Sequence, residues 1–433
     1  MATVKNTIRI GQLGCGIVGS AAIRMLDANA DDIHKRLGVS VGYGPIAVRS
    51  LSKERDIPEG YQDRLTTDPN AVVNDPDVDI IVEAMGGIEP TRTLLLDAIA
   101  NGKHVVTANK ELLATLGQEL FDAADRAGVD IYYEAAVAGG VPLIRPLKES
   151  LVGERISKVM GIVNGTTNYI LTRMEQDGLD FGQALALAEE LGYTELDPSA
   201  DIEGFDAASK AAILASIAFN ARVVAGDVHR EGISHIRSSD MAFAKRLGYT
   251  IKLLAIAEEQ DGEIAVRVHP AMVPTSHPLA SVNENLNAVF VEGERVGELM
   301  FYGRGAGGGP TGTSIVGDVL TIARNIVTGG RGPGCTCNTT KKVRSIEDNF
   351  AQYYLLLEVA DEAGVLATIA QTFGDHDVSI KSVWQEGHGD DAQLVLITHR
   401  ALEKNIQQTL VSLRNHKQVR EVASVLRVEG GEA

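Results

Sequence analysis

The stretch Ile8-Arg9-Ile10-Gly11-Gln12-Leu13-Gly14-Cys15-Gly16-Ile17-Val18-Gly19 decides the fold of this chain. An apolar strand runs into a Gly-x-Gly-x-x-Gly turn and then into a helix over 20–26, so free backbone N–H groups would face a pyrophosphate. The alternative is a plain glycine-rich connection, because a chain with 45 glycines contains such spacings by chance. The flanking pattern favours a dinucleotide-binding turn. Cofactor contacts are expected at Gly14, Gly16, Ile17, Val18 and Gly19.

Strands and helices alternate through the first third of the chain, which is typical of a parallel sheet covered by helices. The expected strands are 7–13, 46–51, 80–84, 104–108 and 131–134, and the expected helices include 91–100 and 111–127. We therefore expect an α/β protein whose residues 1–145 form a Rossmann-type domain with a doubly wound parallel sheet.

The middle of the chain, residues 146–327, has the mixed pattern of an α+β domain. Its expected elements are a helix over 142–151 at the boundary, a strand over 158–163, and helices over 167–177, 181–191 and 204–220. A hairpin should turn at Asp261-Gly262, a dipeptide that supplies positive φ angles, and another at Glu292-Gly293.

The last quarter of the chain predicts a separate small domain. Residues 328–351 are rich in glycine, proline, cysteine and threonine near their start and are interpreted as a linker. Residues 352–430 follow the order βαββαβ of a ferredoxin-like unit. Its elements are expected over 353–359, 365–373, 378–385, 393–398, 401–413 and 419–428.

Composition limits the classes of partner. The formal net charge of −18 leaves no basic footprint for nucleic acid or an anionic membrane, so a small-molecule substrate fits better. The first ten residues carry no secretory signal, and no apolar run approaches the roughly 20 residues of a spanning helix. We therefore expect a cytoplasmic protein.

The chain contains three cysteines, Cys15, Cys335 and Cys337. An odd number in a chain this long is not a disulfide scaffold, so reduced thiols are expected. The pair Cys335 and Cys337 lacks the two further ligands that a structural zinc site requires, so metal binding there is not favoured.

The end of the second strand indicates which nicotinamide cofactor binds, because a carboxylate there holds a ribose 2′-hydroxyl whereas an arginine accepts a 2′-phosphate. Asp31 and Asp32 precede the expected strand, but Arg49 lies at its end, with Lys53 and Arg55 close behind. We expect a preference for NADP, with NAD use possible. The alternative is that Arg49 is a solvated surface charge.

Two groups of residues carry candidate chemistry. Lys110 follows the strand 104–107 at the carboxyl end of the sheet, where ligands of open α/β proteins bind. Asp206 and Lys210 share one helix face within apolar surroundings. Each could instead be an ordinary exposed charge or surface pair, but a lysine near a substrate hydroxyl can serve as acid or base.

The chain resembles the homoserine dehydrogenases through six ordered motifs. These are Gly14-Cys15-Gly16-Ile17-Val18-Gly19, Thr107-Ala108-Asn109-Lys110, Glu134-Ala135-Ala136-Val137-Ala138-Gly139-Gly140-Val141-Pro142, Asn164-Gly165-Thr166-Thr167-Asn168, Gly192-Tyr193-Thr194-Glu195, and Gly204-Phe205-Asp206 with Lys210. The resemblance covers about residues 8–325. The C-terminal module is similar to an ACT domain, with a ligand-type turn over 361–366.

The resemblance implies reversible oxidation of L-homoserine to L-aspartate 4-semialdehyde, on the route to threonine and methionine, with residues 146–327 forming the substrate-binding, catalytic and dimerisation domain. It implies that Lys210 is the acid/base, that Lys110 assists it or holds the substrate, and that Asp206 orients the amino or hydroxyl group. Glu195 would bind the substrate ammonium; Leu196 replaces a proline of many relatives, so this loop is expected to be less rigid.

The resemblance also implies further binding residues. Thr107, Lys110, Gly305 and Gly307 are expected to contact the cofactor. A monovalent cation, sodium by similarity, is expected on oxygens of the 134–141 segment, whose paired glycines could equally form a hinge. Its expected ligands are the side chain of Glu134 and the backbone carbonyls of Val137, Gly139 and Val141.

The ACT resemblance implies an amino-acid effector, for which threonine is the pathway product, and assembly as a homodimer or homotetramer. A purely structural role of the module is the alternative. Two other functions stay open at this point: another nicotinamide-dependent amino-acid dehydrogenase, and a non-catalytic sensor of NADP and an amino acid. Too few residues precede the first strand for a kinase domain, so a monofunctional enzyme is expected.

Overall fold

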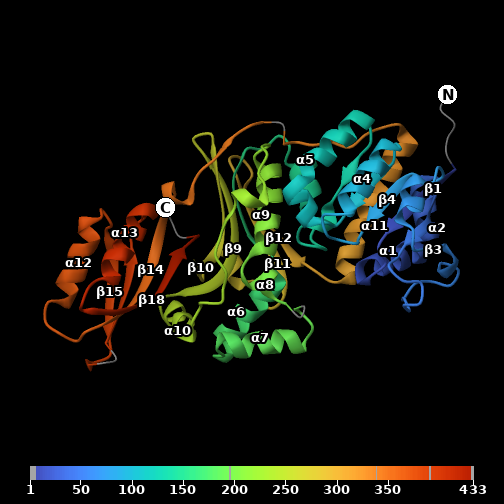
Figure 1. Cartoon of the computed structure of the whole chain (residues 1–433). Coiled ribbons are helices and arrows are strands. Elements are labelled where there is room, and N and C mark those ends of the chain that lie inside the picture. The colour runs from blue at the N-terminus through green and yellow to red at the C-terminus, as the bar shows by residue number, and fades with distance from the viewer. Residues whose placement is uncertain (1–5, 195–196, 338, 390–391, 431–433) are drawn as a thin grey trace. The chain divides into compact units, whose positions relative to one another are not determined.

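The computed structural model describes residues 6–194, 197–337, 339–389 and 392–430. The chain forms two compact units, each built from several segments. The first unit comprises Met1–Val159, Asp206–Val228 and Leu286–Lys341, and the second comprises Met160–Phe205, His229–Asn285 and Lys342–Ala433. Figure 1 labels their helices and strands.

The first unit contains a six-stranded parallel sheet in the order β3-β2-β1-β4-β5-β6. Strands β2 and β3 lie on one side of β1, and β4, β5 and β6 lie on the other, which is the Rossmann arrangement. The order reverses between β1 and β4, and this switch point creates the crevice where dinucleotides bind. The predicted fold class is confirmed. The strands are β1 (Thr7–Leu13), β2 (Ser40–Ala47), β3 (Leu65–Thr66), β4 (Ile80–Glu83), β5 (His104–Thr107) and β6 (Ile131–Tyr132).

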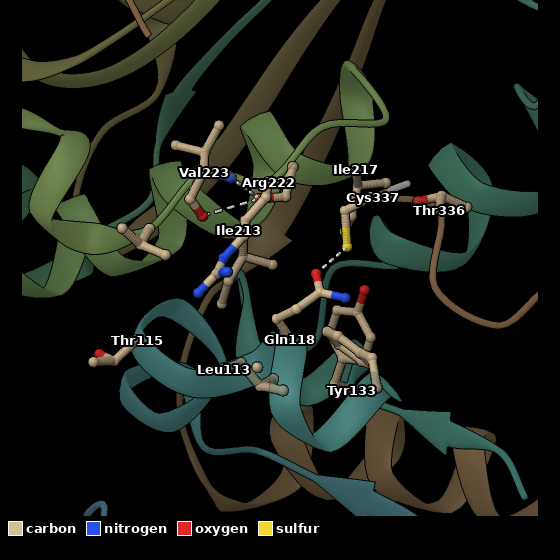
Figure 2. A pocket seen from close by; sticks show the side chains of 14 residues that line it. Leu113, Thr115, Gln118, Tyr133, Ile213, Ile217, Arg222, Val223, Thr336 and Cys337 are labelled. Atoms are coloured by element: carbon tan, nitrogen blue, oxygen red, sulfur yellow. Dashed lines mark hydrogen bonds between the residues drawn. The ribbon is translucent and has the colours of Figure 1, made fainter. Parts of the chain in front are cut away.

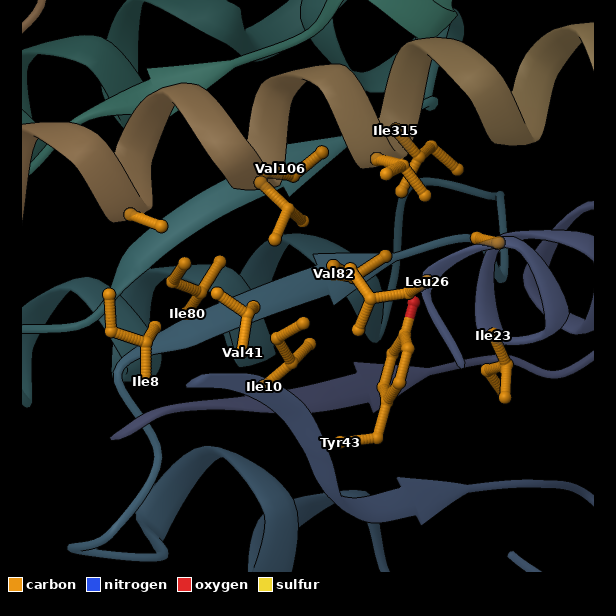
Figure 3. Packing of buried hydrophobic residues seen from close by; sticks show 14 of the residues in the cluster. Ile8, Ile10, Ile23, Leu26, Val41, Tyr43, Ile80, Val82, Val106 and Ile315 are labelled. Atoms are coloured by element: carbon orange, nitrogen blue, oxygen red, sulfur yellow. The ribbon is translucent and has the colours of Figure 1, made fainter. Parts of the chain in front are cut away.

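Helices cover both faces of this sheet, and each face has its own apolar core. Helix α11 (Gly308–Thr328) belongs to one of them, although the last strand of the sheet ends at Tyr132, far earlier in the chain. Figure 3 shows its Ile315 packed over Ile10, Val82 and Val106. The other helices around the sheet are α1 (Ile17–Ala28), α2 (Ala30–Leu37), α3 (Pro69–Asn74), α4 (Thr91–Ala100) and α5 (Lys110–Ala127).

Four further elements belong wholly or largely to the first unit. A π-helical turn covers Pro146–Ser150 within the predicted helix 142–151, and α9 spans Phe205–Ala218. Strands β11 (Leu286–Gly293) and β12 (Gly297–Arg304) form a hairpin. The predicted turn at Glu292-Gly293 is wrong, because both residues pair within the hairpin and the chain reverses after them.

The second unit begins within β7 (Ile156–Ile162) and includes a long hairpin of β9 (Tyr249–Gln260) and β10 (Glu263–Pro274). Its turn is at Asp261 and Gly262, whose φ angles are 55° and 80°, so this predicted turn is confirmed. The remaining elements of this part are α6 (Gly165–Asp177), α7 (Phe181–Glu190), α8 (Ser199–Ile202), β8 (His229–Arg230) and α10 (Ser238–Arg246).

The C-terminal part of the second unit has the predicted βαββαβ order around its own apolar core. Its strands pair in the order β18-β14-β16-β15, and β18 also pairs in parallel with β10. The elements are β13 (Lys342–Val343), β14 (Phe350–Val359), α12 (Val365–Asp375), β15 (Ile380–Glu386), β16 (Gln393–Thr398), β17 (Ala401–Leu402), α13 (Glu403–Arg414) and β18 (Val419–Val428).

Strand β2 is displaced toward the N-terminus from its predicted place at 46–51. The prediction began the strand only after residues 42–45, which contain two glycines and a proline. In the structure these residues are part of the strand, because the register with β1 shifts between Ile10 and Gln12 and a bulge accommodates Gly44-Pro45. Arg49 therefore lies two residues beyond the end of β2.

The cysteines in the segment after α11 also differ from expectation. Cys335 and Cys337 are joined in a disulfide, whereas reduced thiols were predicted. Their Cα atoms are 5.6 Å apart, within the range that a disulfide can bridge, although only one residue separates them.

Among the described residues, no helix has both the length and the apolar character needed to cross a membrane.

Candidate active site

Asp206 brings two lysines together in the first unit. Its Oδ2 atom lies 2.7 Å from Nζ of Lys210, one turn further along α9, and its Oδ1 atom lies 3.1 Å from Nζ of Lys110, the first residue of α5. The side chains of Asp206 and Lys210 are 9% and 12% exposed, and that of Lys110 is 41% exposed. We call these three residues the lysine–aspartate cluster. It carries one formal positive charge and presents Lys110 to the solvent.

The predicted pair on α9 is thus joined by a lysine from a distant helix. The position of Lys110 follows from β5, which ends at Thr107 beside the carboxyl end of β4. Asn109 then caps α5, because its Oδ1 atom accepts a hydrogen bond from the N–H of Leu112 at 3.0 Å. The cluster therefore lies at the carboxyl edge of the sheet, the edge at which open α/β proteins bind ligands.

The dinucleotide turn has the expected backbone form. Gly14 adopts a φ of 93°, and a Cβ atom there would lie 2.6 Å from the carbonyl oxygen of Ala84. A Cβ atom at Gly16 would meet open space, whereas one at Gly19 would meet the carbonyl oxygen of Gly14 at 2.5 Å. Helix α1 begins at Ile17 without a side-chain cap. Its first N–H groups are therefore suited to an anion beside Gly16.

A second helix begins beside this turn. Gly308, the first residue of α11, packs on Ile17, since a Cβ atom at Gly308 would lie 2.9 Å from Cγ2 of Ile17. Neither helix has a side-chain N-cap, so both present unpaired N–H groups and a positive dipole end. Of the two predicted glycines before α11, Gly307 is its N-cap residue, and Gly305 packs against Gly139 and Asn287.

The segment after β2 is basic and exposed. Arg49 is exposed, and the side chain of Arg55 donates hydrogen bonds to the carbonyl oxygens of Ser50 at 2.7 Å and Lys53 at 2.6 Å. The hydroxyl groups of Ser50 and Ser52 are 2.9 Å apart. Arg55 thereby closes residues 50–55 into a loop with hydroxyl groups and cationic side chains, the donors that a phosphate monoester requires.

Thr107, predicted to contact the cofactor, has its hydroxyl engaged within the protein. It donates to the carboxylate of Glu83 at 2.5 Å and accepts from the N–H of Asn109 at 3.0 Å. Sequence reasoning assigned no role to Glu83. The sequence did contain a signal for such a role, since Glu83 is a charged residue at the end of the apolar strand Ile80–Glu83. A carboxylate in that position is buried by the helices that cover the sheet and therefore needs hydrogen-bond donors within the protein.

The three comparisons with known proteins agree. The N-terminal residues 14–134 match the family model described as homoserine dehydrogenase, NAD binding domain, residues 142–320 match the model described as homoserine dehydrogenase, and residues 353–415 match that of the ACT domain. A homoserine dehydrogenase of Corynebacterium glutamicum is 47% identical over 98% of this chain and 96% of its own length. The chain belongs to the homoserine dehydrogenase family. It is accordingly an NAD(P)-dependent oxidoreductase, as the sequence predicts.

Other homoserine dehydrogenases match over the same length. That of Bacillus subtilis is 43% identical over 98% of this chain and 99% of its own. The crystal structure of a homoserine dehydrogenase from Thiobacillus denitrificans superposes with a TM-score of 0.94 at 40% identity, covering 98% of both chains. A hyperthermophilic archaeal homoserine dehydrogenase mutant in complex with NADPH matches 73% of this chain with a TM-score of 0.63 and 26% identity.

The loop predicted to hold a cation in this family makes hydrogen bonds within the protein. The carboxylate of Glu134 accepts hydrogen bonds from the backbone N–H groups of Leu143, Ile144 (2.8 Å) and Arg145 (2.9 Å). Both of its oxygens therefore cap the following helical turn. Oε1 accepts two of these bonds and Oε2 accepts one, so Oε2 can still serve as a cation ligand. The other predicted ligands are loop carbonyls, of which that of Gly139 accepts from the Ser314 hydroxyl at 2.7 Å.

An ion pair between the buried Asp318 and the half-buried Arg145 supports the same loop. The N–H of Glu134 donates to Asp318 on α11 at 2.8 Å, and Asp318 pairs with Arg145 at 2.6 Å. Burial raises the pKa of Asp318 to about 7, the Glu134 carboxylate adds to this effect, and the Arg145 guanidinium opposes it. The loop with the paired glycines Gly139 and Gly140 is thus held to α11 by the side chain of Asp318.

Figure 2 shows a pocket between α5 and α9, beyond the turns that carry the lysine–aspartate cluster. Its walls are mainly apolar, and the sulfur of Cys337 faces the amide oxygen of Gln118 at 3.9 Å. No residue of the lysine–aspartate cluster lines it. The lining side chains include Leu113, Phe121, Tyr133, Ile213, Ile217 and Arg222.

The predicted substrate loop is described only in part. Glu195, predicted to bind the substrate ammonium, and the adjacent Leu196 lie outside the described residues. In the second unit, the Thr166 hydroxyl donates to the carbonyl oxygen of Tyr193 at 2.7 Å, which ties the start of α6 to the residues before Glu195. Asn164 donates to the carboxylate of Asp201 at 2.6 Å on the other side of this loop.

Proposed function

We propose that the lysine–aspartate cluster moves the proton in the reversible oxidation of L-homoserine to L-aspartate 4-semialdehyde. The observation that carries this proposal is the bridging of two lysines by the single carboxylate of Asp206 at the carboxyl edge of the sheet. A bound nicotinamide supplies the hydride acceptor. As hydride leaves the alcohol carbon, the hydroxyl proton passes to Nζ of Lys210, which enters this step as the neutral amine and leaves it as the ammonium. In the reverse direction the Lys210 ammonium returns the proton to the carbonyl oxygen.

The two lysines differ in solvent exposure, and this difference suits them to different roles. Lys210 is held within hydrogen-bond distance of Asp206 and is the more buried, so its amine is oriented for proton transfer away from bulk water. Lys110 is the more exposed and is suited to donate to a polar group of the substrate. Asp206 orients both, and Glu195 is proposed to bind the substrate ammonium.

The function can be tested in one assay. Purified protein, homoserine and either NADP or NAD should produce reduced cofactor, measured by its absorbance. Formation of L-aspartate 4-semialdehyde is confirmed by trapping the aldehyde product. Absence of homoserine-dependent cofactor reduction would contradict the proposed reaction.

We propose that NADP is the preferred cofactor, because the exposed Arg49 and the basic, hydroxyl-bearing loop closed by Arg55 suit a 2′-phosphate. The relative in complex with NADPH supports this choice. Arg49→Ala should lower kcat/KM for NADP by about tenfold, the scale of one charge-assisted contact, and leave that for NAD nearly unchanged. Steady-state kinetics with both cofactors measures this. Equal losses with both, or a strong NAD preference in both proteins, would contradict the proposal.

We propose that the ACT domain binds an amino acid and that threonine, the pathway product, is the effector. Rising threonine up to millimolar concentration should change the rate of homoserine oxidation, and an ACT ligand would act through coupling free energies of about 1–3 kcal/mol. Serine at equal concentration is the matched control. Unchanged rates with threonine would leave the domain a structural role only.

The remaining proposals concern assembly and environment. We propose a homodimer or homotetramer, because ACT domains generally pair, and a cytoplasmic location. The division into domains at 1–145, 146–327, 328–351 and 352–430 stays a prediction. So does a sodium ion on the side chain of Glu134 and the loop carbonyls of Val137, Gly139 and Val141.

A further inference from the structure

Glu83 ends β4 with a fully buried carboxylate that is surrounded by donors. Its Oε1 atom accepts hydrogen bonds from the N–H groups of Met85 at 2.8 Å and Gly86 at 2.9 Å. Its Oε2 atom accepts from the hydroxyl of Thr107 at 2.5 Å. Burial raises the pKa of Glu83, and these three donors act against that change. Because every contact comes from a donor, the arrangement matches an ionised carboxylate that is committed to holding its neighbours.

The contacts of Glu83 continue to the start of α5. The Thr107 hydroxyl that donates to Glu83 also accepts from the N–H of Asn109. Asn109 uses its amide oxygen to cap α5 and its amide nitrogen to donate to the carbonyl oxygen of Gly87 at 2.6 Å. The ring of contacts thereby closes, since Gly87 adjoins the turn that Glu83 holds. Lys110, which directly follows Asn109, starts from a backbone that is restrained on both sides.

The same turn also touches the dinucleotide turn. Ala84, next to Glu83, donates its N–H to the carbonyl oxygen of Leu13 at 2.8 Å. A Cβ atom on Gly14 would lie 2.6 Å from the carbonyl oxygen of Ala84, too close for any side chain. The backbone that leaves Glu83 therefore contacts the cofactor turn at one side and Asn109 at the other.

We infer that Glu83 is a positioning residue for Lys110. Through Thr107 and Asn109 it holds the start of α5, and with it Lys110, beside Asp206. Through the adjacent Ala84 it also holds this start of α5 at a set place relative to the dinucleotide turn. This inference rests on the proposed role of Lys110. The alternative is that Glu83 only stabilises the fold at the end of β4. The two roles predict different kinetics. If Glu83 positions Lys110, disturbing its contacts should lower kcat only in a protein that contains Lys110. If Glu83 only stabilises the fold, the same change should have an equal effect on kcat with and without Lys110.

A double-mutant cycle separates these roles. Thr107→Val removes the hydroxyl that joins Glu83 to Asn109 and keeps the shape of the side chain. In the otherwise unchanged full-length protein it should lower kcat for homoserine oxidation by about tenfold or more, the scale of a misplaced catalytic group. In a Lys110→Met background it should lower kcat by less than about twofold, because the group it positions is gone. Thr107→Ser, which keeps the hydroxyl, should recover most of the loss.

A control variant tests whether the loss of a buried threonine hydroxyl lowers kcat merely by destabilising the protein. Thr409→Val removes another fully buried threonine hydroxyl, which donates to the carbonyl oxygen of Asn405 at 2.8 Å in α13, and should lower Tm with kcat unchanged. If Thr107→Val does not fold, Asn109→Ser replaces it in the cycle, because serine keeps the helix cap but loses the donor to Gly87.

The outcomes distinguish the inference from the proposed function. Equal losses from Thr107→Val, or from Asn109→Ser, in both backgrounds would overturn the positioning role, as would unchanged kcat in the presence of Lys110. Near-normal kcat in Lys110→Met alone would instead remove Lys110 from the proposed function, and the inference would fall with it. A loss confined to the background that contains Lys110 supports both.

Discussion

Lys210→Ala is expected to reduce kcat for homoserine oxidation by about 100- to 10,000-fold, the usual contribution of general acid–base catalysis. The structure holds Nζ of Lys210 at 2.7 Å from Asp206 with the side chain 12% exposed, so water does not readily replace a lost amine in that orientation. KM for homoserine should change much less, because the amine acts on the proton that leaves the hydroxyl in the transition state.

Steady-state kinetics with saturating NADP measures this effect. Lys404→Ala removes an exposed lysine from helix α13 and is the matched control, with kcat expected within about twofold of the original, as is usual for surface changes. Near-normal turnover would exclude Lys210 as the acid/base.

Asp206→Asn is expected to give the second largest effect, a loss in kcat of about 100-fold. The amide keeps the size of the side chain but removes the negative charge that lies 2.7 Å from Lys210 and 3.1 Å from Lys110. Two neighbouring ammonium groups would then repel one another and leave their present positions, and misplacement of this kind costs rates on that scale.

The control for Asp206→Asn is Asp177→Asn, which removes an i,i+4 ion pair with Arg173 on α6, where the aspartate is 45% exposed. An exposed pair contributes only about 0.3–0.5 kcal/mol, so this variant should keep its kcat and almost all of its Tm. If Asp206→Asn changed KM but left kcat unaltered, Asp206 would be a substrate-binding residue without a role in positioning the lysines.

Local sequence patterns predicted most elements correctly. Strand β1 and helix α4 have the predicted bounds, because an apolar alternation and a helical spacing each lie within one short window. Strand β2 was placed too late, because Gly44 and Pro45 are typical of loops and only pairing with β1 shows that a bulge accommodates them. The disulfide between Cys335 and Cys337 was missed because only the structure shows that their Cα atoms lie 5.6 Å apart.

The sequence by itself determined the family, the cofactor turn and the pairing of Asp206 with Lys210, because each is written in spacings of a few residues. Only the tertiary structure decided that Lys110 meets Asp206, that α11 packs on the sheet of β1, and that Glu83 and Glu134 are committed to hydrogen bonds within the protein. The physical reason is that the contacts of Lys110 with Asp206, of α11 with the sheet and of Glu83 with Thr107 join residues distant in sequence. Burial and competing donors, rather than local propensity, determine which side chains remain available to a ligand.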